Sequence, residues 1–210
     1  MRVLISILFR LLFLLGASGV LVSFSDAAAQ TVRVNRGAAI TVLLTGFAVN
    51  KPAQVQDIDD IAQGLPRALV RRLAQTPSFQ IKTTPDLLSL DWQFSQADSK
   101  LLAQTAALYH VQYVIAGQVL NAGVHTEPVW LGLREKKHRA LQLEIHLYDA
   151  LAGVLVQRYE FSTSVTGDVQ IGREHVFDGA GFQATVYGKA IDGLLDEIAQ
   201  KMGAKILSLP

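Results

Sequence analysis

Histidine is the residue type in this sequence that is best suited to metal binding or proton transfer, and the chain contains no cysteine to complete a zinc site. No two histidines stand one helical turn apart, as they do in an H-E-x-x-H motif. We therefore expect the histidines on the surface or on strand faces, outside any metal site. They are His110, His125, His138, His146 and His175.

Motifs for nucleophilic or cofactor chemistry are also missing from the sequence. There is no G-x-S-x-G elbow and no P-loop, and Gly179-Ala-Gly181 is too short for a dinucleotide fingerprint, so we interpret it as a loop before the last helix. Asp196 and Glu197 are adjacent, so on a helix they point in different directions, and we expect Asp196 to face solvent. The sequence thus predicts a protein that is not an enzyme and holds no cofactor.

Two basic clusters have the charge to bind an anion or an acidic partner. The simpler interpretation is that the first cluster lies on a solvated helix face and the second at the end of a loop. The clusters are Arg67, Arg71 and Arg72, and Lys136, Lys137, His138 and Arg139.

The connection Asn121–Lys137 is unusual because an apolar stretch, Pro128–Leu133, lies within a polar segment. Apolar side chains in a loop are expected to be buried against another surface and not left in water. They either fold back onto the sheet of the same molecule or anchor a protein interface, where a buried tryptophan is often a hot spot. The interface candidates are Trp130, Leu131, Leu133 and Arg134.

The N-terminus has the three parts of a secretory signal peptide: a basic start, an apolar run, and small residues before the cleavage site. We predict a cleavable signal peptide at Met1–Ala29, followed by one domain over residues 30–210. Cleavage would remove Arg2, Arg10 and Asp26, so the 19 basic and 18 acidic residues would become 17 and 17. A balanced charge does not indicate nucleic-acid binding, which usually requires an excess of basic residues. Without cysteine, the chain also has no site for lipid attachment.

The hydrophobic pattern of the remaining chain alternates strands with helices. Strands are predicted from continuous or alternating apolar runs and helices from three- and four-residue spacing. For Asp57–Gln75, the proline at Gly64–Pro66 predicts a kink or a restart of the helix. The predicted strands are Ala39–Phe47, Phe79–Lys82, Val111–Leu120, Ala140–Tyr148 and Val154–Ser162, and further helices end at Tyr109 and run over Tyr187–Ile206.

These elements predict an α/β (α+β) fold in the order β-α-β-α-β-β-β-α, or with one strand fewer. The sheet is mixed and has about five strands, with its helices mainly on one face. In Ala140–Tyr148 the alternation predicts a wetter face that carries Gln142, Glu144, His146 and Tyr148. The acids Asp57, Asp59 and Asp60 are expected to be solvated partners of a helix dipole.

Four segments together resemble the middle domain of flagellar assembly protein T (FlgT), from about Ile40 to Met202. They are DIAQGLPR at Asp60–Arg67, YVIAGQV at Tyr113–Val119, YDALAG at Tyr148–Gly153 and YGKAIDGLL at Tyr187–Leu195. The resemblance implies a fold like the N-terminal domain of TolB. It also implies a non-enzymatic, periplasmic part of the flagellar H ring that supports ring assembly and motor function.

The same resemblance implies other basal-body or ring proteins as partners, with self-association in a ring and neither nucleic acid nor a direct membrane anchor. FlgT proteins have further domains before and after this one, for which the chain has no room. The alternative is therefore a soluble periplasmic adaptor of another envelope machine, in secretion or cell-wall synthesis.

Overall fold

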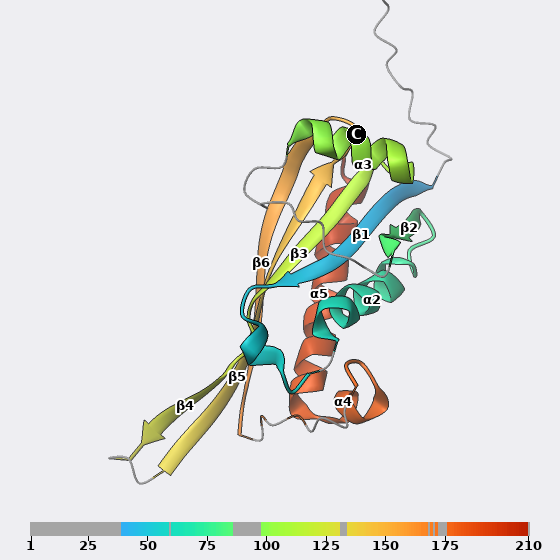
Figure 1. The fold of residues 1–210 in the computed structure, drawn as a ribbon. Coiled ribbons are helices and arrows are strands. Elements are labelled where there is room, and N and C mark those ends of the chain that lie inside the picture. Colours follow the sequence, from blue (N-terminus) through green and yellow to red (C-terminus); the bar gives the residue numbers. More distant parts are fainter. Residues whose placement is uncertain are drawn as a thin grey trace, which may run out of the picture. The chain divides into compact units, whose positions relative to one another are not determined.

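The computed structural model describes residues 39–58, 60–85, 98–130, 134–167, 169, 171 and 176–209 (Figure 1). The chain divides into two units, Met1–Arg36 and Gly37–Pro210, and the description below concerns the second. The predicted signal peptide Met1–Ala29 lies outside the described residues and stays a prediction.

A mixed sheet is the centre of this unit, as predicted from the sequence. Within the described ranges it has six strands in the order β2-β1-β3-β5-β4, with β6 on the other edge of β5. β1 runs parallel to β2 and β3, whereas β5 is antiparallel to β3, β4 and β6. The strands are β1 (Ile40–Val49), β2 (Phe79–Thr83), β3 (Tyr113–Asn121), β4 (Val124–Val129), β5 (Arg134–Asp149) and β6 (Val154–Thr166).

Helices cover both faces of the sheet, with the larger layer on one of them. Leu44 and Ile115 belong to the main core with α2, α4 and α5, whereas Leu43 and Val114 belong to a smaller core under α3. Helices mainly on one face were predicted, and α3 is the exception. The helices are η1 (Pro52–Val55), α2 (Ile61–Leu73), α3 (Ser99–Tyr109), α4 (Ala180–Ala184) and α5 (Val186–Leu207).

Helix α2 runs through Pro66, so the predicted restart of the helix at Gly64–Pro66 does not occur, and the kink stays a prediction. Leu65, Pro66 and Leu69 are buried, and this burial offsets the backbone hydrogen bond that proline cannot donate. Gly64 is needed for a close approach, because a Cβ atom at this position would overlap the ring of Phe177. The prediction of a loop at Gly179–Gly181 is wrong in part, since Ala180 begins the short helix α4.

The predicted wet face of β5 is buried over most of its length. Gln142 is exposed as expected, but Glu144, His146 and Tyr148 are buried. The prediction was wrong because it took polar residues to be exposed. Polar side chains can be buried when hydrogen bonds satisfy them, as they do here.

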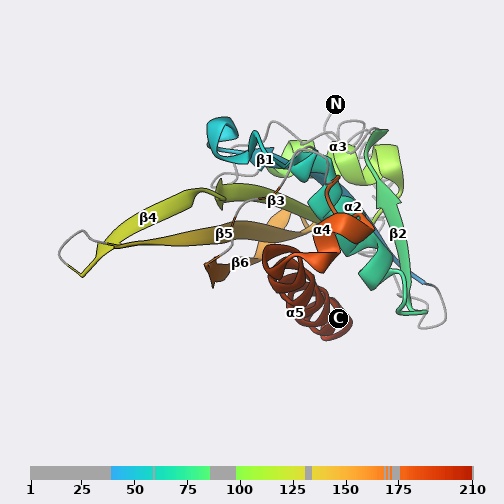
Figure 2. The same ribbon diagram turned by 90° about the horizontal axis from the view of Figure 1, so that it is seen from below.

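The connection Asn121–Lys137, predicted as a loop, instead contains β4 and the first residues of β5. Val124 pairs with Arg139 and Val129 with Arg134, so the two strands form a hairpin that continues the β3–β5 ladder. The hairpin projects beyond the helices in Figures 1 and 2. Sequence alternation could not reveal it, because both faces of the hairpin meet solvent and neither selects apolar residues.

Candidate functional site: the β4–β5 arm

Residues 124–130 and 134–137 belong to a hairpin, called the arm from here on, and on these described residues both faces of its strands meet solvent. All residues of β4 are exposed, and so are the residues of β5 from Arg134 to Lys137. Strand β6 adds a third strand beside β5, but its pairing with β5 ends at His138. Among the described strands, none pairs with the free edges of the arm beyond that residue. A two-stranded hairpin alone in water is marginally stable at best, so the arm depends on its continuity with the sheet for stability.

Trp130 follows β4 at the tip of the arm and is the most exposed large apolar side chain of the described residues, at 77 %. Its backbone φ is +56°, a left-handed conformation that costs a residue with a Cβ roughly 1–2 kcal/mol. For Trp130, the alternative of folding back onto the sheet is wrong. Arg134 is exposed at the first position of β5, whereas Leu131 and Leu133 lie outside the described residues, and the interface stays a prediction.

The base of the arm is fixed by a buried arginine. Arg139 is fully buried and donates to both carboxylate oxygens of Asp57, at 2.6 and 2.7 Å. Its guanidinium also donates to the carbonyl of Val169 and lies 4.7 Å from the ring centre of Tyr187. The expectation of Arg139 at a loop end is therefore wrong. Asp57 is paired with it and still 36 % exposed, and Lys136 and Lys137 are exposed as expected.

Burial raises the pKa of Tyr187 to about 12, although the nearby Arg139 acts in the opposite direction. The phenol is thus neutral beside the guanidinium and presents its ring to the charge. The ion pair and the ring contact join the segment before α2, strand β5 and helix α5 at the point where the arm leaves the sheet.

Strand β5 also carries a buried polar row that the sequence did not identify as a cluster. Glu144 accepts from Gln118 Nε2 at 2.9 Å, lies 2.9 Å from His146 Nε2 and pairs with Arg158. His146 Nδ1 lies 3.0 Å from the hydroxyl of Tyr148. The alternation of Glu144, His146 and Tyr148 on one strand face was the available signal, and it was interpreted as a wet surface.

A carboxylate, an imidazole and a phenol in a row can relay protons, but their surroundings oppose it. Burial is the main cause that lowers the pKa of His146, with Glu144 acting against it. Burial and Glu144 together raise the pKa of Tyr148 to about 12. His146 and Tyr148 are buried, so neither side chain meets solvent from which a substrate could enter. Its contacts are those of a satisfied core network.

The arginines of α2 are paired with carboxylates and leave little charge for an anion. Arg72 donates to Asp196 from Nε at 2.6 Å and also pairs with Asp192. Asp196 is exposed as expected, and it also takes part in this ion pair. Arg67 lies 2.9 Å from Asp60, and Arg71 pairs with Asp178. These ion pairs connect α2 to α5 and to the segment before α4.

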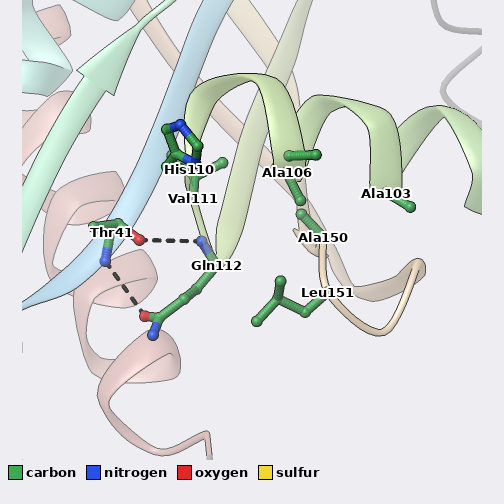
Figure 3. A pocket seen from close by; sticks show the side chains of 9 residues that line it. Thr41, Ala103, Ala106, His110, Val111, Gln112, Ala150 and Leu151 are labelled. Carbon is green, nitrogen blue, oxygen red and sulfur yellow. Dashed lines mark hydrogen bonds between the residues drawn. The ribbon is translucent and has the colours of Figure 1, made fainter. Parts of the chain in front are cut away.

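A shallow hollow of about 410 Å³ lies at the end of the sheet that carries α3 (Figure 3). Small apolar side chains of α3 and of the turn after β5 form its walls. Thr41 and Gln112 also line it and are joined by two hydrogen bonds, from Gln112 N–H to Thr41 Oγ1 at 3.2 Å and from Thr41 N–H to Gln112 Oε1 at 3.4 Å. His110 is the only ionisable side chain among the described residues that line it. The wall residues include Ala103, Ala106, Ala107, Val111, Ala150 and Leu151.

Two further features are absent from the part of the chain that the structure describes. There, the histidines and acids form no group of three that could hold a metal ion. Likewise, none of the described helices is long and apolar enough to cross a bilayer.

Fold and surface together define an α/β domain with an exposed hairpin arm and a buried polar row. The chain belongs to the family described as flagellar assembly protein T, middle domain, whose model matches residues 37–175. This confirms the resemblance seen in the sequence. The matched range includes the arm and the hollow.

Solved structures match this chain at low sequence identity, and the first described here, with a TM-score above 0.5, shows the same kind of fold. The hypothetical protein CT253 from Chlamydia trachomatis is 13 % identical, with 80 % of this chain and 97 % of that chain covered and a TM-score of 0.55. A PelC dodecamer from Paraburkholderia phytofirmans is 10 % identical, with 77 % and 86 % covered and a TM-score of 0.44. TolB from Acinetobacter baumannii is 12 % identical, with 80 % and 27 % covered and a TM-score of 0.37. A search of curated proteins finds no match.

Proposed function

We propose that this protein is a non-enzymatic, periplasmic component of the flagellar basal body, of the H-ring type, which supports ring assembly and motor function. The observation that carries the proposal is the family match over residues 37–175, because that family is one of flagellar assembly. The exposed arm adds a surface suited to protein contacts, and the buried polar row is closed to substrates.

Deletion of the gene tests the role directly. Swimming is measured in soft agar, and isolated basal bodies are imaged by electron microscopy. Loss of an outer ring with an intact rod and hook, restored by a plasmid copy, is the expected result. Normal swimming with intact rings would reject the flagellar role, and recovery of non-flagellar envelope proteins in pull-downs would then favour the adaptor function.

The periplasmic location rests on the predicted signal peptide. Cleavage after Ala29 leaves Gln30 as the first residue, so mass spectrometry of the purified protein should find that N-terminus. Replacing Leu12 and Leu14 by arginine should stop export, because two charges break the apolar run of the signal. Detection of the uncleaved chain in the periplasm, or export of the arginine variant, would contradict the prediction.

A further inference from the structure

The tip of the arm and the hollow beside α3 lie at opposite ends of one strand. β5 begins at Arg134 in the arm and ends at Asp149, and the next two residues, Ala150 and Leu151, line the hollow. A strand of 16 residues spans about 50 Å at ~3.4 Å per residue. Figure 1 shows the arm and α3 at the two ends of the sheet accordingly.

The arm cannot reach the hollow of its own molecule. From His138 to Asp149, strand β5 pairs with β6, and from Gln142 to Asp149 it also pairs with β3. Bending this ladder back on itself would break its hydrogen bonds and expose the core on both faces. Any contact between the two surfaces is therefore a contact between two molecules.

The two surfaces complement each other in size and polarity. Trp130 presents an exposed indole beside the half-exposed Val129, and the hollow of about 410 Å³ is larger than an indole and has alanine, valine and leucine walls. Aromatic side chains that fill such depressions are the usual anchors of protein interfaces. Arg134 beside the tip and Asp149 beside the hollow have opposite charges.

The edges of the arm argue against a partner that adds a strand. Pro128 lacks the N–H group that an incoming strand would need, and Lys136 and Lys137 place charge on the other strand of the arm. Proline and lysine are common devices against edge pairing. What the arm offers a partner is the apolar side chain at its tip.

We propose that Trp130 of one copy inserts into the hollow between α3 and the turn after β5 of the next copy. This inference rests on the proposed function as a ring component and names the contact between its subunits. Such a contact joins two different surfaces, so it repeats from copy to copy and closes into a ring when the rotation between copies allows it.

Cysteine cross-linking tests the contact, since the chain has no cysteine of its own. One purified chain carries Val129→Cys, beside the intact Trp130, and a second carries Leu151→Cys at the rim of the hollow. The two are mixed with diamide as the oxidant and separated on a non-reducing gel. The expected result is a disulfide-linked heterodimer at least tenfold more abundant than with Val176→Cys, a control that is 65 % exposed near α4.

Two further variants show whether the indole and the hollow are responsible. Adding Trp130→Ala to the first chain removes the anchor, and adding Ala107→Trp to the second fills the hollow from an exposed helix position. Each should reduce the heterodimer to the level of the control, with a melting temperature unchanged within about 1–2 °C, the shift that roughly 0.5 kcal/mol produces in a chain of this size. Equal yields with Val176→Cys, or cross-links that survive both changes, would overturn the contact.

Failure of the contact and failure of the proposed function give different results. If deletion removes the outer ring but cross-linking stays at the control level, the ring function stands and the contact is wrong. If cross-linking succeeds and rings are normal without the gene, the chain associates with itself outside the flagellum. Dimers of Val129→Cys alone, formed as readily as the heterodimer, would show contact between two tips and reject the hollow as the binding site.

Discussion

The two halves of strand β5 show how differently one strand can be used. Arg134–Lys137 pairs with β4 and is exposed on both faces, whereas Leu143–Tyr148 lies between β3 and β6 and is buried on both faces. The sequence changes accordingly, from R-E-K-K to L-E-I-H-L-Y. The buried half stabilises the fold, and the exposed half contributes little to the core.

The largest effect is expected from truncation within the buried half. Leu143→Ala removes a fully buried side chain from the main core and should lower the free energy of unfolding by about 3 kcal/mol. Lys136→Ala in the exposed half is the matched control and should change it by less than about 0.5 kcal/mol. Urea denaturation followed by circular dichroism measures both. Similar losses for the two variants would contradict the contrast between the halves.

The boundary between the halves should be the next most sensitive position. Asp57→Asn leaves Arg139 buried without its carboxylate and should cost about 2 kcal/mol, less than a fully buried pair because Asp57 is 36 % exposed. Arg139→Met in the Asp57→Asn background removes the unpaired charge and should recover part of the loss. Urea titrations of the single and double variants give the coupling free energy between Asp57 and Arg139. A double variant less stable than Asp57→Asn would show that the arginine matters mainly for packing.

A smaller effect concerns the pH dependence of the buried half. Burial lowers the pKa of His146 below its ordinary 6.5, so at mildly acidic pH the unfolded chain binds a proton there that the folded chain does not. This contribution to stability is complete above pH 6.5 and is lost as the pH falls through and below that value. The melting temperature should therefore decrease less between pH 7 and pH 5 in His146→Gln than in the unchanged protein. Parallel curves would contradict the pKa shift.

The smallest change in stability is expected at the tip of the exposed half. Trp130→Ala should leave the free energy of unfolding within about 0.5 kcal/mol, because the side chain is 77 % exposed. Trp130→Gly should equal or exceed the stability of the unchanged protein, since glycine adopts a φ of +56° without strain. Thermal melts compare the two. A loss above about 1 kcal/mol for Trp130→Ala would show that the indole packs within its own molecule.

Patterns of burial decided what the sequence could predict. The mixed sheet and its helices on one main face followed from apolar runs such as that of β1 and from the stripe of α5, whose buried residues belong to the same core. The arm could not be predicted as a hairpin, because strand alternation is recognisable only when one face is buried. Its tip was nevertheless found, since Trp130 is an apolar residue in a polar setting.

The buried polar contacts were missed for a different reason. Asp57 and Arg139 are 82 residues apart and meet only after the sheet has formed. A charge that is paired in the core and a charge that is solvated look the same in a sequence, so Glu144 and Asp57 were both interpreted as solvent-facing. The partner of each is specified by the fold, not by its neighbours in the chain.

The length of β5 has a mechanical consequence if subunits are joined at its two ends. A pull between neighbours then acts along the strand, parallel to its axis and across the hydrogen bonds that hold it to β3 and β6. Because both contacts lie at the ends of one strand, its covalent backbone carries the load, and the ladders to β3 and β6 hold that strand extended. A chain of these subunits would therefore transmit tension through its sheets, and the helices would bear little of the load.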